Sequence, residues 1–319
     1  MTFPSKSYRL SHSSLKSLHV CERMYQLDRL LVGANTEKQD YPATVLGKAY
    51  GAGVQAYLIT KDINAAIFAL WTYYSPNLED DIRTQEVAIN LLESSVPAMD
   101  LLLQDWEILT IKGKPAVEMG FRLNIDENYH YVGYIDAVMQ NRWTGKVAVF
   151  DVKSTSLRLF DLSPVYQNSP QCLAYSLVID TIVGEEKSEY DVYYFVGQLG
   201  SGNGFTPTIR NYSFPKNLQD RLHFLITLGM DVAHLKEMAA YNIYPQRGDS
   251  CLQYNRPCKH FGVCNLFTLD TNLEKDENEV EIVYDFTYQL DEVITNHLAR
   301  ITKPTPTNNT NAITQTQEN

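Results

Sequence analysis

Two aspartates and a lysine lie within two short apolar stretches of the sequence. Asp136 belongs to the run Gly-Tyr-Ile-Asp that starts at Gly133, and Asp151 and Lys153 belong to the run that starts at Val147. Neighbouring carboxylates repel one another, and burying them is costly unless something compensates their charge. Mg²⁺ compensates such charge well because it binds one or two carboxylates together with waters and phosphate oxygens. The lysine can orient a water molecule or offset charge on a phosphate under attack. The alternative is a surface hairpin in which Asp151 and Lys153 only form an ion pair.

The stretch from Gly133 to Thr155 predicts a β-hairpin. Strands over Tyr131–Met139 and Val147–Val152 flank a turn at Asn141–Lys146, and such apolar runs around a turn are typical of hairpins. Because side chains alternate along a strand, Asp151 and Lys153 share a face that Asp136 can also reach.

Further elements surround this hairpin. Apolar and polar residues alternate over Val117–Ile125 and predict a strand that carries Glu118. We favour a solvent-facing role for Glu118 over a place in the metal site. A helix over Pro170–Asp180 places Gln171 and Tyr175, four residues apart, on one face. Another strand is predicted at Tyr190–Val196.

Helices are predicted on both sides of these strands. Together with the strands they predict an α/β fold, with a mixed central sheet flanked by helices. The predicted helices are Tyr8–Leu31, Gly47–Leu58, Asp62–Tyr74, Thr84–Ile108, Leu218–Ala239 and a last one ending at Arg300.

The five cysteines suggest a second site. Cys251, Cys258 and Cys264 are separated by six and five residues, and Cys21 becomes a fourth ligand if the two ends of the chain meet. Four thiolates suit either Zn²⁺ or a four-iron four-sulfur (4Fe-4S) cluster. Cys172 lies on a predicted helix and is interpreted as an ordinary core residue.

Composition limits the function classes. The chain has 319 residues, 44% hydrophobic residues and a net charge of −11. This charge argues against a broad nucleic-acid-coating surface, but a nuclease needs only a few basic residues beside its metal ions. The sequence contains neither a membrane-spanning run nor a signal peptide, which predicts a cytoplasmic protein.

The order of these motifs resembles the PD-(D/E)XK nuclease superfamily, in particular its RecB-like branch. That branch includes iron–sulfur exonucleases of CRISPR adaptation, the nuclease of AddB-type recombination subunits and phage-encoded relatives. The resemblance spans Ser11 to Phe267. It rests on a Ser-rich helix leading to Cys21, Gly47-Lys48-Ala49, Gly-x-Ile-Asp at Asp136, Asp-x-Lys at Asp151, Gln-x-x-x-Tyr at Gln171 and the cysteine cluster.

The resemblance implies a restriction-endonuclease-like core. It implies that Asp136 and Asp151, with Glu118 as a further candidate, hold Mg²⁺ or Mn²⁺, and that Lys153 assists the attacking water. Gln171 and Tyr175 would support the site and contact substrate. Cys21, Cys251, Cys258 and Cys264 would hold a 4Fe-4S cluster. One departure stands out, because the histidine that usually follows the first glycine of Gly-x-Ala by four residues is replaced by Gly51.

The expected function is therefore a metal-dependent deoxyribonuclease, most simply an exonuclease. Its substrate would be single-stranded DNA or DNA with free ends, in a bacterial cell or a phage-infected host. A recombination or replication protein is the expected partner. The alternatives are a DNA-binding or interaction module that has lost turnover with the histidine, and a zinc protein with an interactive role.

One nuclease domain is expected over residues 1–269. It would comprise a helical part at 8–110, a catalytic core at 115–200, and a helix with the cysteine cluster at 215–267. A helical extension over 270–302 and a disordered tail over 303–319 would follow.

Overall fold

The computed structural model describes residues 8–30, 41–80, 82–184, 189–200, 206–253, 256–264, 284–285 and 290–302. The expected tail at 303–319 and most of the expected extension before 290 lie outside these residues. Within them, eight strands form one mixed sheet, in the order β12-β5-β6-β7-β8-β9 with β1 and β2 pairing to β6. The main strands are β1 (Tyr8–Leu10), β2 (Trp106–Ile108), β5 (Val117–Asn124), β6 (Tyr129–Asn141), β7 (Val147–Thr155), β8 (Glu189–Gln198), β9 (Thr208–Asn217) and β12 (Tyr284–Asp285).

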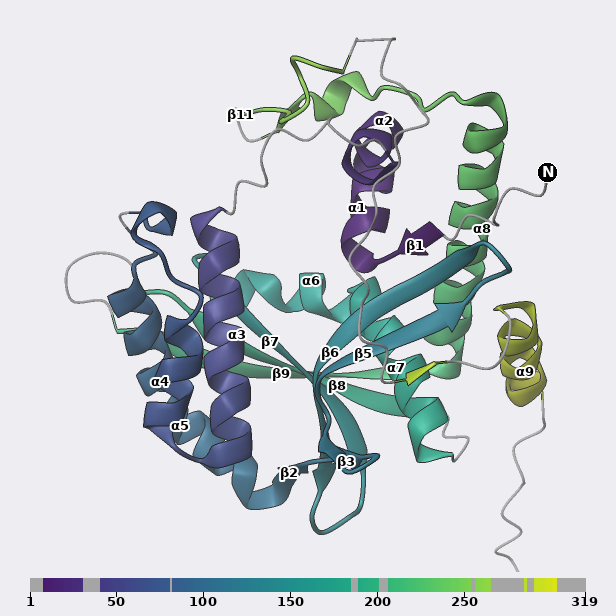
Figure 1. Ribbon diagram of the computed structural model, residues 1–319. Helices are drawn as coiled ribbons and strands as arrows, with labels where there is room; N and C mark the ends of the chain where they lie inside the picture. The colour runs from purple at the N-terminus through teal and green to yellow at the C-terminus, as the bar shows by residue number, and fades with distance from the viewer. Residues whose placement is uncertain are drawn as a thin grey trace, which may run out of the picture.

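Helices cover both faces of this sheet, as the α/β prediction requires. Figure 1 shows α3, α4 and α5 grouped on one side of the sheet and α7 and α8 on the other. The helices of the described chain are α1 (His12–Val20), α2 (Glu22–Tyr25), α3 (Pro42–Thr60), α4 (Ile63–Trp71), α5 (Gln85–Asp105), α6 (Ser163–Gln167), α7 (Pro170–Val183), α8 (Leu218–Tyr241) and α9 (Leu290–Thr302). Short elements complete it: a π-helical turn at Gln26–Leu30, 3₁₀ turns at Pro76–Leu78, Leu159–Leu162 and Gly248–Ser250, and the strand pairs β3 (Thr110–Ile111) with β4 (Lys114–Pro115) and β10 (Leu252–Gln253) with β11 (Arg256–Pro257).

Two apolar cores lie on opposite faces of the sheet. The α3–α5 core contains Phe150 and Val152 of β7, and the α7–α8 core contains Val147 and Val149 of the same strand. Covered on both faces, β7 is buried almost continuously, as expected of a central strand. It runs antiparallel to β6 and parallel to β8, with α7 in the crossover.

The four predicted strands are present, and the described residues contain further strands that were not predicted. The segment Tyr8–Leu10, expected to be helical, is a strand that pairs parallel to β6 at Tyr129. The end of the helix expected over Thr84–Ile108 is also a strand, because Trp106–Ile108 (β2) pairs antiparallel with β6. Another unpredicted strand is β9, an edge strand that carries Pro215. Proline cannot donate a ladder hydrogen bond and is tolerated at a sheet edge.

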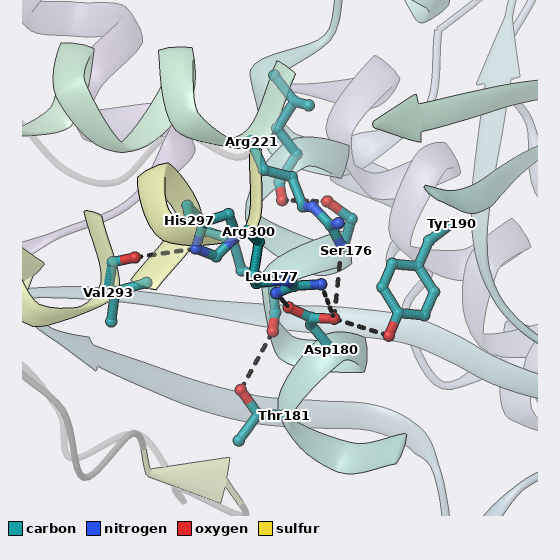
Figure 2. Close-up of polar contacts among 10 residues, drawn as sticks. Ser176, Leu177, Asp180, Thr181, Tyr190, Arg221, Val293, His297 and Arg300 are labelled. Atoms are coloured by element: carbon teal, nitrogen blue, oxygen red, sulfur yellow. Dashed lines mark hydrogen bonds and ion pairs between the residues drawn. The ribbon is translucent and has the colours of Figure 1, made fainter. Parts of the chain in front are cut away.

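Helix α9 is fastened to the α7–α8 core by a buried polar cluster. Figure 2 shows Asp180 of α7 contacted by Arg300 of α9, by the Tyr190 hydroxyl (2.8 Å) and by the fully buried Arg221 of α8 (3.7 Å). The Arg221 guanidinium also lies over the Tyr190 ring, 4.9 Å from its centre. Two guanidiniums sharing one carboxylate tie three helices and β8 together behind the sheet.

Candidate active site

Asp136 and Asp151 lie side by side on neighbouring strands. The β6–β7 ladder pairs Ala137 with Phe150, and continuing this antiparallel register by one residue brings Asp136 opposite Asp151. The Oδ2 atom of Asp136 accepts a hydrogen bond from the backbone N–H of Val152 (2.8 Å). Beyond the last β6–β7 backbone pair, the Asp136 carboxylate thus accepts the hydrogen bond of the Val152 N–H in place of a backbone carbonyl.

Asp136, Asp151 and Lys153 form a carboxylate–lysine cluster, and Asp151 is its most deeply buried side chain. Its side chain is 0% exposed, and its Oδ2 lies 2.6 Å from Lys153 Nζ. Its Oδ1 has no hydrogen-bond partner in the described part of the chain. A buried carboxylate oxygen left in this state is costly unless a cation or another donor reaches it.

The burial of these side chains shifts their pKa values. Burial, together with the charge of Asp151, raises the pKa of Asp136 to about 6. Burial also raises the pKa of Asp151, against the effect of Lys153. For Lys153, burial works against the charged form, but the two aspartates outweigh it and raise the pKa of the ammonium group. Lys153 is therefore a stable cation, and a bound divalent ion would relieve the repulsion between the aspartates.

Glu118 belongs to this cluster through an irregularity of β5. Val117 pairs with Ala137 and Met119 with Ile135, so Glu118 stands level with Asp136. Residues two apart in a strand normally share a face, yet Val117 packs in the α3–α5 core and Met119 in the α7–α8 core. Glu118 has a φ of 46°, and this left-handed conformation breaks the alternation. Such strain in a non-glycine residue is typical of functional sites.

Helix α3 contacts the cluster through Gln55. Its Nε2 donates a 2.7 Å hydrogen bond to Glu118 Oε1. Desolvation raises the pKa of Glu118, the Gln55 bond lowers it, and Asp136 raises it further. From the sequence, Gln55 was not regarded as a close substitute for the histidine that the resemblance leads one to expect at Gly51. Its signal was its place one helical turn after Gly51.

Gly51 leaves space beside the cluster. A Cβ atom placed on it would meet no atom of the described residues within 4 Å. The same helix is closer to the active-site strand at Gly47, where an added Cβ would lie 3.7 Å from Ser154 Oγ. The missing histidine has thus not been replaced by another side chain at its own position.

Gln171 and Tyr175 brace the cluster from α7. Gln171 Nε2 donates to the Tyr175 hydroxyl at 2.5 Å. Tyr175 is buried, and its pKa is raised by burial and by the charges of Asp151 and Asp136. Both residues belong to α7, the helix that follows the Lys153 strand, and the charges of Asp151 and Asp136 act on Tyr175. Cys172, between them, is fully buried in the α7–α8 core.

The four remaining cysteines surround one cavity of about 130 Å³. Cys21 lies between α1 and α2, and Cys251, Cys258 and Cys264 come from the segment after α8. Cys21 and the segment after α8 therefore lie at the same cavity, as expected. All five cysteines are free thiols. However, no three Cys, His, Asp or Glu side chains in the described ranges form a ready metal-holding group.

Polar contacts tie the two walls of this cavity together. Arg247 donates to both carboxylate oxygens of Glu22, which lowers the pKa of Glu22 to about 2. The Ser250 hydroxyl donates to the Val20 carbonyl (2.6 Å), and buried His260 contacts Asp28 (2.7 Å). These contacts join the N-terminal helices to the segment after α8, and none of the cysteines forms a disulfide.

The mixed sheet flanked by helices and the carboxylate–lysine cluster are the features expected of a nuclease core. Residues 9–265 match the PD-(D/E)XK nuclease superfamily, and the chain belongs to this family. A solved structure from Eubacterium rectale, named "Putative exonuclease", is similar to this chain over 79% of its length and 91% of that chain, with 13% identity and a TM-score of 0.46. None of the curated proteins matches the sequence. Among the described helices, none is long and apolar enough to cross a membrane.

Proposed function

We propose that this protein is a Mg²⁺- or Mn²⁺-dependent deoxyribonuclease of the RecB-like branch that acts as an exonuclease on single-stranded DNA or DNA with free ends. The observation that carries the proposal is Asp151, a fully buried carboxylate with one unpartnered oxygen beside a second carboxylate of raised pKa. Oxygen donors of this kind fit a hard divalent cation. The superfamily assignment supports hydrolysis of a nucleic acid.

Asp136 and Asp151 would hold the cation, and Glu118, fixed by Gln55, would complete the site from β5. The cation supplies charge neutralisation at the scissile phosphate and a lower pKa for its bound water. Burial alone would lower the pKa of Lys153, but the charges of Asp151 and Asp136 raise it, which favours a charged ammonium group. This group would orient the water by donating a hydrogen bond and stabilise negative charge that develops on the phosphate. Gln171 and Tyr175 would hold the substrate strand against these groups.

The cysteine cavity would hold a structural 4Fe-4S cluster. Its donor set, four thiols around one cavity, suits this cluster or Zn²⁺. A bound cluster supplies a covalent tie between the N-terminal helices and the segment after α8. On this view residues 1–269 form one nuclease domain. The packing of Leu290 and Val293 into the α7–α8 core supports adding α9 to it as an extension.

A second candidate function rests on Gly51. The open space at that position is consistent with a nuclease fold that binds DNA and metal but turns over slowly, as a DNA-binding or interaction module. The acidic protein, at a net charge of −11, would then act together with a recombination or replication partner in the cytoplasm of a bacterial or phage-infected cell.

Digestion of end-labelled DNA by anaerobically purified protein tests these functions. We expect Mn²⁺ to support progressive shortening from an end, and the protein to be brown and to contain iron. Binding of metal and DNA without cleavage would favour the binding module. A colourless protein with one zinc per chain would refute the iron–sulfur assignment and leave the nuclease proposal standing.

A further inference from the structure

A second cavity, of about 240 Å³, lies between α1, the start of α7 and α8. Its walls are mainly apolar, with Leu15 from α1 and Leu228 from α8. Tyr131 of β6 and Phe224 of α8 also line it, and their rings meet edge-to-face with centres 5.7 Å apart. Its volume is below the roughly 300 Å³ at which pockets for drug-sized ligands begin. The cavity therefore suits a group the size of one base and excludes a base pair.

The α1 side of this cavity carries one lysine and two histidines. His12, Lys16 and His19 follow one another at helical spacing and all line the cavity. Lys16 and His19 are exposed, and His19 Nε2 contacts the two carboxylate oxygens of Asp231 on α8 at 2.9 and 3.0 Å. Because Asp231, the acidic group of this lining, is paired with His19, Lys16 is the cation of the lining available to a phosphate.

The cavity adjoins the carboxylate–lysine cluster. Burial lowers the pKa of His12, and the charge of Lys153 lowers it next, ahead of Lys16 and His19. His12 is therefore within electrostatic reach of Lys153. Pro170, which lines the cavity, directly precedes Gln171. A nucleotide in this cavity would thus be close along the strand to a phosphate at Lys153.

We propose that this cavity binds one unpaired nucleotide of the DNA strand, with its base against the Tyr131–Phe224 wall and a phosphate beside Lys16. Apolar contacts to a base together with a cation near its phosphate are how proteins bind single strands without sequence preference, because every base has an apolar face and every linkage a charge. This inference rests on the proposed nuclease function and deepens it. It makes an unpaired strand end the preferred substrate.

Filling the cavity tests the inference. In Thr227→Trp the new side chain enters from α8, at a residue that lines the cavity and is exposed. The matched control is Ile226→Trp, which adds the same side chain on the same helix at an exposed position that does not line the cavity. Binding of the full-length protein to fluorescent single-stranded oligonucleotides is measured by anisotropy in Ca²⁺, with a single abasic site moved along the strand. In the parent and in Ile226→Trp, one abasic position should weaken binding by about tenfold, and in Thr227→Trp this position should no longer stand out.

A charge variant tests the phosphate contact. Lys16→Gln should flatten the salt dependence of single-strand binding by about one phosphate contact. Lys146→Gln, an exposed lysine in the turn between β6 and β7, is the control and should not. If the parent cuts DNA but the abasic scan is flat, the cavity inference is wrong and the nuclease proposal survives. If the parent neither binds nor cuts DNA under any metal condition, both are wrong.

Discussion

The carboxylate cluster and the cysteine cavity position their ligands in opposite ways. Asp136, Asp151 and Lys153 lie on two paired strands of a buried sheet, so the backbone ladder sets their separation. Cys21 and Cys264 come from distant parts of the chain and meet through irregular segments, held by contacts such as Arg247 with Glu22. In neither place do three Cys, His, Asp or Glu side chains of the described residues already form a metal-holding group. The difference lies in the backbone, because paired strands fix the carboxylates, whereas irregular segments carry the thiols, and we expect the proposed cofactor to draw those thiols together. Rigid secondary structure thus pre-organises the first site, and the second would depend on its ligand.

The sharpest test of this difference removes one group from the pre-organised site. Asp151→Asn keeps the shape of the side chain but removes a buried charge, so DNA cleavage in Mn²⁺ should fall by about a thousandfold because electrostatic stabilisation is lost. Iron content and colour should not change. Asp126→Asn is the control, because this aspartate pairs with Lys236 away from the cluster. Parent-like cleavage by Asp151→Asn would place the activity elsewhere.

The cysteine cavity should respond through stability. Cys21→Ser should lose the iron and lower the melting temperature by about 5 °C or more, since 1 kcal/mol corresponds to roughly 2–4 °C in domains of this size. Cys172→Ser, in the core and outside the cavity, should keep its iron. Iron analysis and thermal unfolding under anaerobic conditions measure both quantities. Retention of full iron by Cys21→Ser would remove this residue from the ligand set.

A substitution at Gly51 is expected to increase the affinity for metal. Gly51→His introduces the residue type that the family resemblance implies, at a position with free space, and histidine also costs less than glycine in a helix. We expect Mn²⁺ affinity to rise by about tenfold, the effect of one added ligand worth about 1.4 kcal/mol. Calorimetric titration against Gly51→Ala, which adds only a methyl group, isolates the imidazole. Equal affinity in the two variants would show that α3 does not reach the metal.

The smallest effect concerns pH. The pKa of Asp136 is raised from its usual 3.8 to about 6, so the folded metal-free protein binds this proton more tightly than the unfolded chain. Stability without metal should therefore fall as pH rises from about 4 to about 6, by about 2 kcal/mol. Asp136→Asn should reduce this slope in urea unfolding. Cleavage should show the opposite trend and rise through pH 6, because the metal requires the ionised carboxylate. A stability that rises over this range in the parent and is unchanged by Asp136→Asn would contradict the assignment.

The sequence predicted the parts of the fold that depend on local pattern. Apolar alternation located β5, apolar runs around a turn located β6 and β7, and helical spacing located α7 and α8. The strand β1 was missed because three residues carry too little pattern and its pairing with β6 is decided by distant sequence. Glu118 was favoured as a solvent-facing residue because it stands on the polar side of a regular strand. Its positive φ, which no residue pattern signals, instead turns it toward Asp136. Gln55 was set aside as no close substitute for the histidine, and its contact with Glu118 could not be predicted because it depends on where α3 crosses the sheet.

The most direct test of the central claim is calorimetric titration of Mn²⁺ into the metal-free parent, Asp151→Asn and Asp126→Asn, beside the DNA digestion. The claim is that Asp136 and Asp151 jointly hold the divalent cation on which cleavage depends. We predict measurable binding by the parent and by Asp126→Asn, and loss of both binding and cleavage in Asp151→Asn. Undiminished Mn²⁺ binding by Asp151→Asn, or DNA cleavage by the parent in excess chelator, would contradict the claim.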